Sequence, residues 1–385
     1  MEFQLTEDQR MIEASAQDWL AGNHSFAQRE ERKRQPKESN KVWADFAELG
    51  WLGLALREDV GGFGAGPMEA GLLMQSFGES LVTEPFVSSI LQAARLVDLQ
   101  GSDDQRSSLL PKVIDGSERL AYAHAESGVM SPWAPRNARA TKTNIGWKID
   151  GVKEGVEGAE AATLYIVTAS CDDGAQRAFM VLPDASGLVA DHYDTLDGYR
   201  AADLWLSGVE VDVDAVLGSG PADAGIARVA SESLVTQCWE AAGAMKTVVA
   251  QTSAYTQQRK QFGRALSAFQ VVQHRLAEML VECTEAQASC ELASMLLANS
   301  DGPCWTDAAM LKSRVSRAAE FVSKNAVQLH GAMGVCEELP VAATFRMLLA
   351  FQLKQGDGRR LAAQVGAEFL SSGAYAESAT LGAAN

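Results

Sequence analysis

Apolar positions in the first third of the chain recur every three to four residues, which is the period of an amphipathic helix. Ile12, Ala16 and Leu20 share one face, and Thr6 with Gln9 has the spacing of a capping box ahead of them. The pattern predicts a helical N-terminal domain over residues 1–117. Further helices are expected at 70–77, 87–99 and 103–114.

The period changes near Arg119. Short β-rich runs such as TLYIVTA and DLWLSGVEV then alternate with turn dipeptides, among them Asp150-Gly151 and Asp197-Gly198. This alternation predicts a small antiparallel β domain over residues 118–223.

Apolar residues at helical spacing recur over long stretches in the last third of the chain. One apolar face continues from Ile226 to Thr252, and the following ones predict helices at 271–297, 306–329, 341–351 and 358–370. We therefore expect a helical bundle over residues 224–370 and a disordered tail over 371–385. The expected fold class is α+β: a helical domain, an antiparallel β domain and a helical bundle.

Composition and charge exclude several classes of partner and of site. The 385 residues carry a formal net charge of -17, which argues against nucleic acid or an anionic membrane as the main partner. Six scattered cysteines without C-x-x-C spacing indicate reduced thiols rather than disulfides or a zinc site. The start lacks a signal-peptide pattern and no apolar run could span a membrane, so we expect a cytoplasmic protein without membrane insertion.

Two C-terminal motifs carry candidate chemistry. Arg259, Phe262 and Gln270 lie in RKQFGRALSAFQ, where a guanidinium at a helix end could bind a diphosphate. From spacing alone, the favoured interpretation is a simple turn between helices with a solvated Arg and a core Phe. Gln328, Gly331 and Gly334 of QLHGAMG could let backbone approach a ligand, although glycines after a helix are also ordinary C-caps.

Together, these motifs and the order of domains resemble the acyl-CoA dehydrogenase family over about residues 1–370. Arg259, Phe262, Gly263 and Gln270 match its Arg-x-x-Phe-Gly turn with a following Gln. Gln328, Gly331 and Gly334 match its Gln-x-x-Gly-(Gly)-x-Gly turn, with Ala332 for the middle Gly. The resemblance implies binding of FAD and acyl-CoA, removal of hydrogens from Cα and Cβ, and an electron-transfer flavoprotein as acceptor. These six cofactor-binding residues are expected: Arg259, Phe262, Gln270, Gln328, Gly331 and Gly334.

The chain departs from the family at its catalytic base. The usual Glu position is occupied by Gln355, a neutral amide that cannot accept the α-proton. Some members carry the Glu 22 residues before the Tyr that matches Tyr255, and that position is Ser233. Glu232 is adjacent, but one residue turns a helix by about 100°, so we expect it to face elsewhere, in solvent. The catalytic residue therefore stays unknown.

Departures also occur around the expected flavin site. Asp357 replaces a Thr that contacts the flavin phosphate in the family. The loop that wraps the flavin ring, Thr-Glu-Pro-x-x-Gly-Ser-Asp, is AESGVMSPWAPR at 125–136 and keeps Glu126. The family's Lys-x-Phe/Trp-Ile-Thr segment begins here with Lys153-Glu154-Gly155-Val156.

In this family one flavin lies across a dimer, with its ring in one subunit and its ADP half against the neighbour. The chain retains the two turns that would contact the ADP half of a neighbour's flavin. It lacks the base and the ring-contacting segments that a flavin ring of its own would need. It resembles most the small subunit of pimeloyl-CoA dehydrogenase and related heteromeric enzymes for dicarboxylic, fatty or steroid-derived acyl-CoAs. A non-catalytic subunit of a heterotetramer, needing a second acyl-CoA dehydrogenase subunit, is one hypothesis. An active homomeric flavoenzyme of desulfinase-like chemistry and a flavin-free acyl-CoA-binding scaffold are the alternatives.

Overall fold

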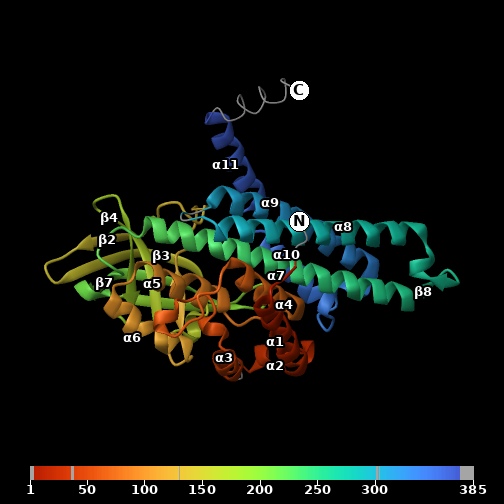
Figure 1. The fold of residues 1–385 in the computed structure, drawn as a ribbon, viewed down its shortest axis with the longest axis horizontal. Coiled ribbons are helices and arrows are strands. Elements are labelled where there is room, and N and C mark those ends of the chain that lie inside the picture. The colour runs from red at the N-terminus through yellow and green to blue at the C-terminus, as the bar shows by residue number, and fades with distance from the viewer. Residues whose placement is uncertain (1–3, 36–38, 130, 301, 303, 373–385) are drawn as a thin grey trace.

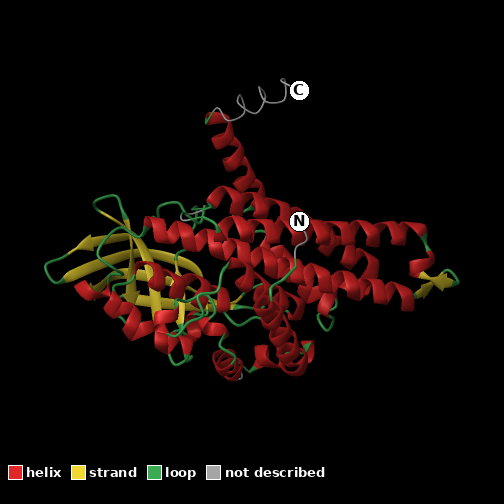
Figure 2. Cartoon of the chain, viewed as in Figure 1, coloured by secondary structure: helices red, strands yellow, loops and turns green. Residues whose placement is uncertain are grey.

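The computed structural model describes residues 4–35, 39–129, 131–300, 302 and 304–372. It contains a helical part, a β-sheet part and a long helical bundle, in the order that the sequence predicts (Figures 1 and 2). The predicted tail lies, apart from its first two residues, outside the described residues. The N-terminal helices are α1 (Glu7–Asn23), α2 (Phe26–Arg34), α3 (Ser39–Glu48), α4 (Pro67–Ser80), α5 (Arg95–Gln100) and α6 (Asp103–Ile114).

Capping side chains set the beginnings of these helices. The predicted capping box at α1 is confirmed, because Thr6 Oγ1 accepts from the backbone N–H of Gln9 at 3.2 Å and Gln9 caps Thr6 in return. Ser102 and Gln105 form the same arrangement at α6. The helix expected at 87–99 begins differently: Val87–Ala94 is a π-helical segment that continues into α5.

The middle part is a seven-stranded sheet in which most neighbours run antiparallel, as expected. However, β4 pairs in parallel with both β1 and β2, so the sheet is mixed. Antiparallel pairs join β2 to β3, β3 to β7, β6 to β7 and β4 to β5. The strands are β1 (Leu120–Ala123), β2 (Arg139–Lys142), β3 (Gly146–Glu157), β4 (Leu164–Cys171), β5 (Gln176–Val181), β6 (Leu188–Asp194) and β7 (Arg200–Asp212).

The bundle is built around α7, which runs through the length of the molecule (Figure 1). Its far end leads into a two-stranded hairpin and then into α8, and α11 projects away from the body. The bundle helices and the hairpin strands are α7 (Asp223–Gln258), β8 (Lys260–Gln261), β9 (Arg264–Ala265), α8 (Gln270–Ala298), α9 (Trp305–His330), α10 (Pro340–Phe351) and α11 (Gly358–Ser371).

Glycines allow α4 of the N-terminal part to cross α7 at close range. A Cβ at Gly243 would overlap the carbonyl oxygen of Gln75, and one at Gly78 would overlap that of Glu240. The side chain of Trp239 fills the space over Gly71. This contact fixes the N-terminal part against the bundle.

Two apolar cores result. The larger joins the N-terminal helices to the bundle and the smaller lies within the sheet. Across the described ranges, the six cysteines are free thiols, no group of His, Cys, Asp and Glu is arranged to hold a metal ion, and no helix is long and apolar enough to cross a membrane.

Candidate functional site

The two positions at which the resemblance would place a catalytic base meet in the structure. Ser233 lies on α7 and Gln355 in the loop between α10 and α11, yet Ser233 Oγ donates to Gln355 Oε1 at 3.1 Å. Gln92, from the π-helical segment, donates through Nε2 to Ser233 Oγ at 3.2 Å. Both positions are therefore neutral and hydrogen-bonded to each other, and neither offers a carboxylate.

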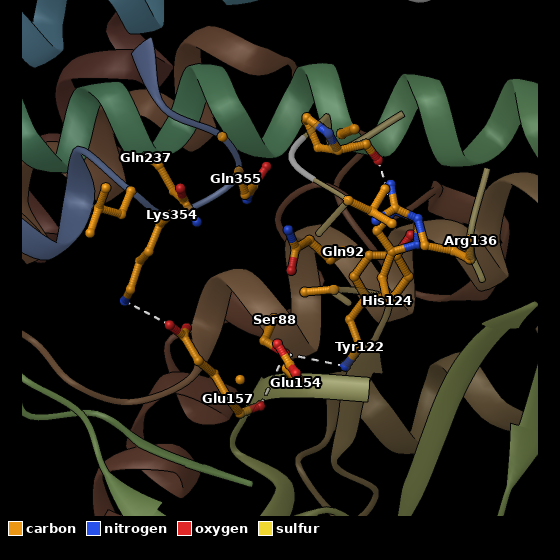
Figure 3. Close-up of a pocket in the computed structure, with 17 residues that line it drawn as sticks. Ser88, Gln92, Tyr122, His124, Arg136, Glu154, Glu157, Gln237, Lys354 and Gln355 are labelled. Atoms are coloured by element: carbon orange, nitrogen blue, oxygen red, sulfur yellow. Dashed lines mark hydrogen bonds and ion pairs between the residues drawn. The ribbon is translucent and has the colours of Figure 1, made fainter. Parts of the chain in front are cut away.

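Gln355 belongs to the wall of a cavity of about 280 Å³ that lies where the three parts of the chain meet (Figure 3). The backbone of Gln355 has φ of 54°, in the left-handed region. The N-terminal part supplies Ser88 and Gln92, and α7 supplies Gln237. The sheet contributes the largest polar share of the wall: Tyr122, His124, Arg136, Glu154 and Glu157.

Glu232 does not reach this cavity, as the helical rotation predicts. The expectation that it is solvated was wrong, because its side chain is only 14% exposed and forms ion pairs with Arg95 at 2.9 Å and Arg228 at 2.6 Å. These three residues line a separate cavity of about 220 Å³. Two guanidinium partners hold Glu232 in place as a structural anion.

A buried ion cluster closes one side of the main cavity. Lys354 Nζ lies 2.6 Å from Glu157 Oε1 and 2.5 Å from Asp197 Oδ2, over the ring of Tyr199. Burial alone would lower the pKa of Lys354, but the two carboxylates outweigh it and raise that pKa. The ammonium group is therefore charged at neutral pH and holds the loop of Gln355 against the sheet.

Glu240 completes this cluster from α7. Tyr199 Oη donates to Glu240 Oε1 at 2.9 Å. Burial raises the pKa of Glu240 to about 7, against the opposing effects of Lys354 and the Tyr199 hydrogen bond. Sequence reasoning missed this cluster, although Glu157 could have been noticed: it follows Val156 at the place where the family segment that begins at Lys153 has Thr.

The loop 125–136 is held by its own side chains. Glu126 pairs with the fully buried Lys153 at 2.5 Å and accepts from the backbone N–H of Ala138 at 3.1 Å. Arg136 donates to the carbonyls of Ala134 and Ser131 at 2.9 and 2.6 Å. Ser131 also matches the Ser of the family pattern, which sequence reasoning overlooked.

His124 is fixed inside the same region. Its ring nitrogens lie 2.7 Å from Thr168 Oγ1 and 2.7 Å from the Pro132 carbonyl oxygen, and the ring stacks on Tyr122. Burial, with the nearby charges of Arg136 and Lys153, lowers the pKa of His124 well below its usual value. A neutral imidazole with both nitrogens engaged is a structural group rather than a free proton acceptor.

Asp357 has a structural role that the sequence reasoning did not foresee. It is the N-cap of α11, and its Oδ1 accepts from the backbone N–H groups of Arg359 and Arg360 at 2.9 and 3.0 Å. A carboxylate is a favoured N-cap side chain. The anion expected to oppose a diphosphate thus stabilises the beginning of a helix.

The two C-terminal motifs come together at the far end of the bundle. Tyr255, near the end of α7, stacks on His330 with ring centroids 4.3 Å apart and donates to its carbonyl oxygen at 3.3 Å. Arg259 follows α7, and Gly331 with φ of 62° follows α9. The turns that contain the expected cofactor residues are therefore neighbours.

The side chains of these motifs face outward. Phe262 is 89% exposed at the tip of the hairpin, and Arg259, Gln270 and Gln328 are exposed without a hydrogen bond or ion pair from their side chains to any described residue. Gly334 is different, because a Cβ there would crowd the backbone of Val327, so close packing explains this glycine. The arrangement leaves one guanidinium and two amides available to an external anion.

The outward motifs and the cavity lie too far apart within the chain to contact the same small ligand. Ser233 and Arg259 lie on or directly after α7, 26 positions apart, which corresponds to roughly 39 Å along the helix. A ligand at the hairpin and a ligand in the cavity of the same chain would therefore occupy two separate sites.

Comparison with known proteins gives consistent matches. The family models for the acyl-CoA dehydrogenase N-terminal domain and C-terminal domain match residues 6–117 and 231–370. The acyl-CoA dehydrogenase FadE12 of Mycobacterium tuberculosis is 25% identical over 355 residues, covering 88% of this chain and 89% of the relative.

Solved structures agree over nearly the whole chain. The Tcur3481-Tcur3483 steroid ACAD G363A variant is similar with a TM-score of 0.86 and 25% identity, over 96% of this chain and 99% of that one. The ChsE4-ChsE5 complex from Mycobacterium tuberculosis has a TM-score of 0.85 at 21% identity, again over 96% and 99%, which shows a shared fold.

Proposed function

Because the chain belongs to the acyl-CoA dehydrogenase family, we propose that it is the non-catalytic small subunit of a heteromeric, FAD-dependent enzyme that dehydrogenates an acyl-CoA. The observation that carries this proposal is the hydrogen bond between Gln355 and Ser233, which occupies both positions of the family's base with neutral groups. Removal of an α-proton needs a positioned base, and an amide and a hydroxyl cannot serve.

The acidic groups elsewhere on the cavity wall do not replace that base. Glu157 is neutralised by Lys354 at 2.6 Å. Glu154 lies with Glu157 on the side of the cavity away from Gln355 (Figure 3). A proton acceptor on that side would not stand where the family's reaction geometry requires it.

The cavity also does not fit a flavin ring. The Glu157–Lys354 ion pair stands at the position of the family's Thr, and the loop 125–136 is closed by Arg136 and His124. We therefore assign no reaction step to this chain's own cavity. The flavin, which supplies the hydride acceptor in this family, would have its ring in the partner subunit.

The side chains of the two exposed C-terminal motifs suit the ADP half of FAD. Arg259 can donate to a diphosphate, Gln270 and Gln328 can add amide hydrogen bonds, and Phe262 can cover an apolar part of the ligand. A bidentate guanidinium contact is among the strongest that a protein surface offers to phosphate. This chain would thus complete the flavin site of a second acyl-CoA dehydrogenase subunit, from which an electron-transfer flavoprotein would take the electrons.

The bundle surface supports assembly with such a partner. Large apolar side chains are exposed along α8, including Val271, Leu280, Val281 and Leu292. Exposed apolar groups gathered on one element indicate an interaction surface. A heterotetramer built through the bundle would cover them.

The decisive test is FAD binding by the complex that a tagged version of this chain forms with its partner in its own cells. Arg259→Ala should lower FAD affinity by roughly tenfold to a hundredfold, because it removes a charge-assisted contact to the diphosphate. Lys260→Ala, which removes an exposed charge from the same hairpin, is the matched control and should leave FAD affinity unchanged.

Two results would contradict the proposal. One is an Arg259→Ala complex of normal size that keeps its full FAD affinity. The other is a chain that purifies alone as a yellow protein and reduces a dye with an acyl-CoA, because such a chain would have its own working flavin site.

A further inference from the structure

A separate pocket of about 110 Å³ lies between α2, α3 and the turn that joins β6 to β7. None of the described residues that line it also lines the cavity at Gln355. Arg32 comes from α2, Trp43 from α3, and Arg119 stands directly before β1. Three segments of the chain therefore bring hydrogen-bond donors to one pocket.

Two of these donors are buried without a partner. Trp43 is 1% exposed, and its Nε1 has no hydrogen-bond partner among the described residues. Arg32 Nη2 is buried and unpaired in the same way. Both atoms can only donate. Buried polar atoms are nearly always paired, so two unpaired donors on one wall indicate an acceptor that is not part of the chain.

Arg119 adds a positive charge that no carboxylate balances. Its Nη1 donates to Asn40 Oδ1 at 2.8 Å, and its guanidinium lies over the ring of Trp43, 5.3 Å from the centroid, but it forms no ion pair with a described residue. Arg200, on the same wall, is paired with Glu160 at 2.8 Å and Asp194 at 3.4 Å. The charge left over on the wall is thus that of Arg119.

The buried carboxylate of the wall, Glu84, is engaged elsewhere. Its Oε1 accepts from Ser39 Oγ at 3.1 Å and lies 3.6 Å from Arg32 Nε. Its Oε2 lies 3.7 Å from His24 Nε2. Glu84 is therefore held by groups other than the Trp43 indole and the Arg119 guanidinium, and it leaves both of them free to bind a second anion.

From this geometry we infer that the pocket binds a small oxyanion, a carboxylate or inorganic phosphate, whose oxygens accept from Trp43 Nε1, Arg32 Nη2 and the Arg119 guanidinium. Charged oxygens form the strongest hydrogen bonds with guanidinium groups. The volume is well below the roughly 300–1,000 Å³ of pockets for drug-sized ligands, so a nucleotide does not fit. The pocket uses neither the hairpin nor the wall at Gln355, and it is independent of the proposed function.

The indole N–H resonance of Trp43 reports on this pocket in the full-length chain made with isotope-labelled tryptophan. Potassium phosphate and potassium acetate are titrated separately at neutral pH, with potassium chloride keeping the ionic strength constant. At least one of the two should shift the Trp43 resonance saturably, whereas chloride alone should not. Trp43→Phe identifies the resonance by its disappearance. Arg119→Gln identifies it independently, because loss of the guanidinium over the ring displaces the same resonance.

Arg119→Gln should also weaken the anion roughly tenfold to a hundredfold, because it removes charge-assisted hydrogen bonds. Arg139→Gln is the matched control. It removes an exposed cation at the beginning of β2, outside the described wall of the pocket, and should leave the affinity unchanged.

A saturable shift with phosphate, with acetate or with both would support the inference and show which oxyanion the pocket accepts. No saturable shift with either anion, or an equal shift with chloride, would overturn it without any variant, since water would then be the partner of the two buried donors. An affinity that Arg119→Gln leaves unchanged would overturn it as well.

Discussion

Replacing Glu240 by Gln should stabilise the protein above neutral pH, with an effect that disappears in acid. Glu240 is 7% exposed where α7 meets the sheet, and it faces Tyr199, Lys354, Glu157 and Asp197. Burial is the largest cause that raises its pKa to about 7 from the usual 4.5 of a glutamate. Ionising this buried group is therefore costly in the folded state.

The sign follows from proton linkage. Between about pH 4.5 and 7 the folded chain keeps a proton on Glu240 that the unfolded chain has released, so stability falls as pH rises through this window. Above pH 7 the penalty is complete. A difference of about 2.5 pKa units corresponds to roughly 3 kcal/mol at most.

Glutamine mimics the protonated acid, and its carbonyl can keep the hydrogen bond from Tyr199. The variant should match the wild type near pH 4.5 and exceed it at pH 8. With an unfolding entropy of about 2.1 cal/mol/K per residue, 3 kcal/mol corresponds to a Tm increase of about 4 °C for a chain of this length. Differential scanning fluorimetry at pH 5, 6, 7 and 8 measures it.

The comparison with wild type is needed because another buried group acts in the opposite direction. Burial lowers the pKa of Lys312 to about 7, so its contribution rises with pH between 7 and about 10.5. Subtracting the two pH curves removes the contribution of Lys312 except for the part that the charge of Glu240 itself adds by raising the pKa of Lys312. Glu232→Gln on the same helix is the matched control, and it should destabilise the protein at pH 8 because Arg95 and Arg228 lose their carboxylate. A Glu240→Gln Tm difference that is constant with pH, or that falls toward pH 8, would refute the reasoning.

Two further predictions follow from packing and from the cavity. Gly243→Ala should destabilise the protein by about 1–3 kcal/mol or more, since the added methyl overlaps the backbone of Gln75, whereas Gly22→Ala, with nothing near its Cβ, should be neutral or slightly stabilising by thermal denaturation. Gln355→Glu should not create acyl-CoA-dependent dye reduction in the chain expressed alone with added FAD. On the proposed function, the Glu157–Lys354 ion pair and the closed loop 125–136 would still occupy the ring site. Activity clearly above the parent would show that the flavin site was intact.

The helices were predictable because their information is local. Apolar stripes and capping residues such as Thr6 lie within one or two turns of the positions they determine, and the structure confirms the cap at Thr6. The parallel pairing of β4 with β1 and β2 was not predictable in this way. Strand neighbours are chosen by contacts across the sheet, and alternation along one strand does not show which strand lies beside it.

The features of the site also divide into those that local sequence predicts and those that depend on residues far apart in the chain. Gln355 and Ser233 could be singled out because each stands at a fixed spacing from a recognisable motif. Their contact could not be foreseen, since it joins residues 122 positions apart. Glu232 was misjudged only in part for this reason. Its partner Arg95 is 137 positions away, but its other partner, Arg228, lies four residues earlier on the same helix, a spacing that indicates an ion pair from the sequence alone.

The residues that depart from the family pattern form hydrogen bonds or ion pairs within the chain. Gln355 has Ser233, Glu157 has Lys354, and Asp357 has the first N–H groups of α11. An enzyme that had merely lost its base would keep the rest of its flavin ring site. Here the replacements bond to the protein itself, and on the proposed function they would close the ring side while the exposed Arg259 would remain available to another molecule. A carboxylate returned to position 355 would face Glu154 and Glu157 across the same cavity, and the added negative charge would oppose catalysis and binding together.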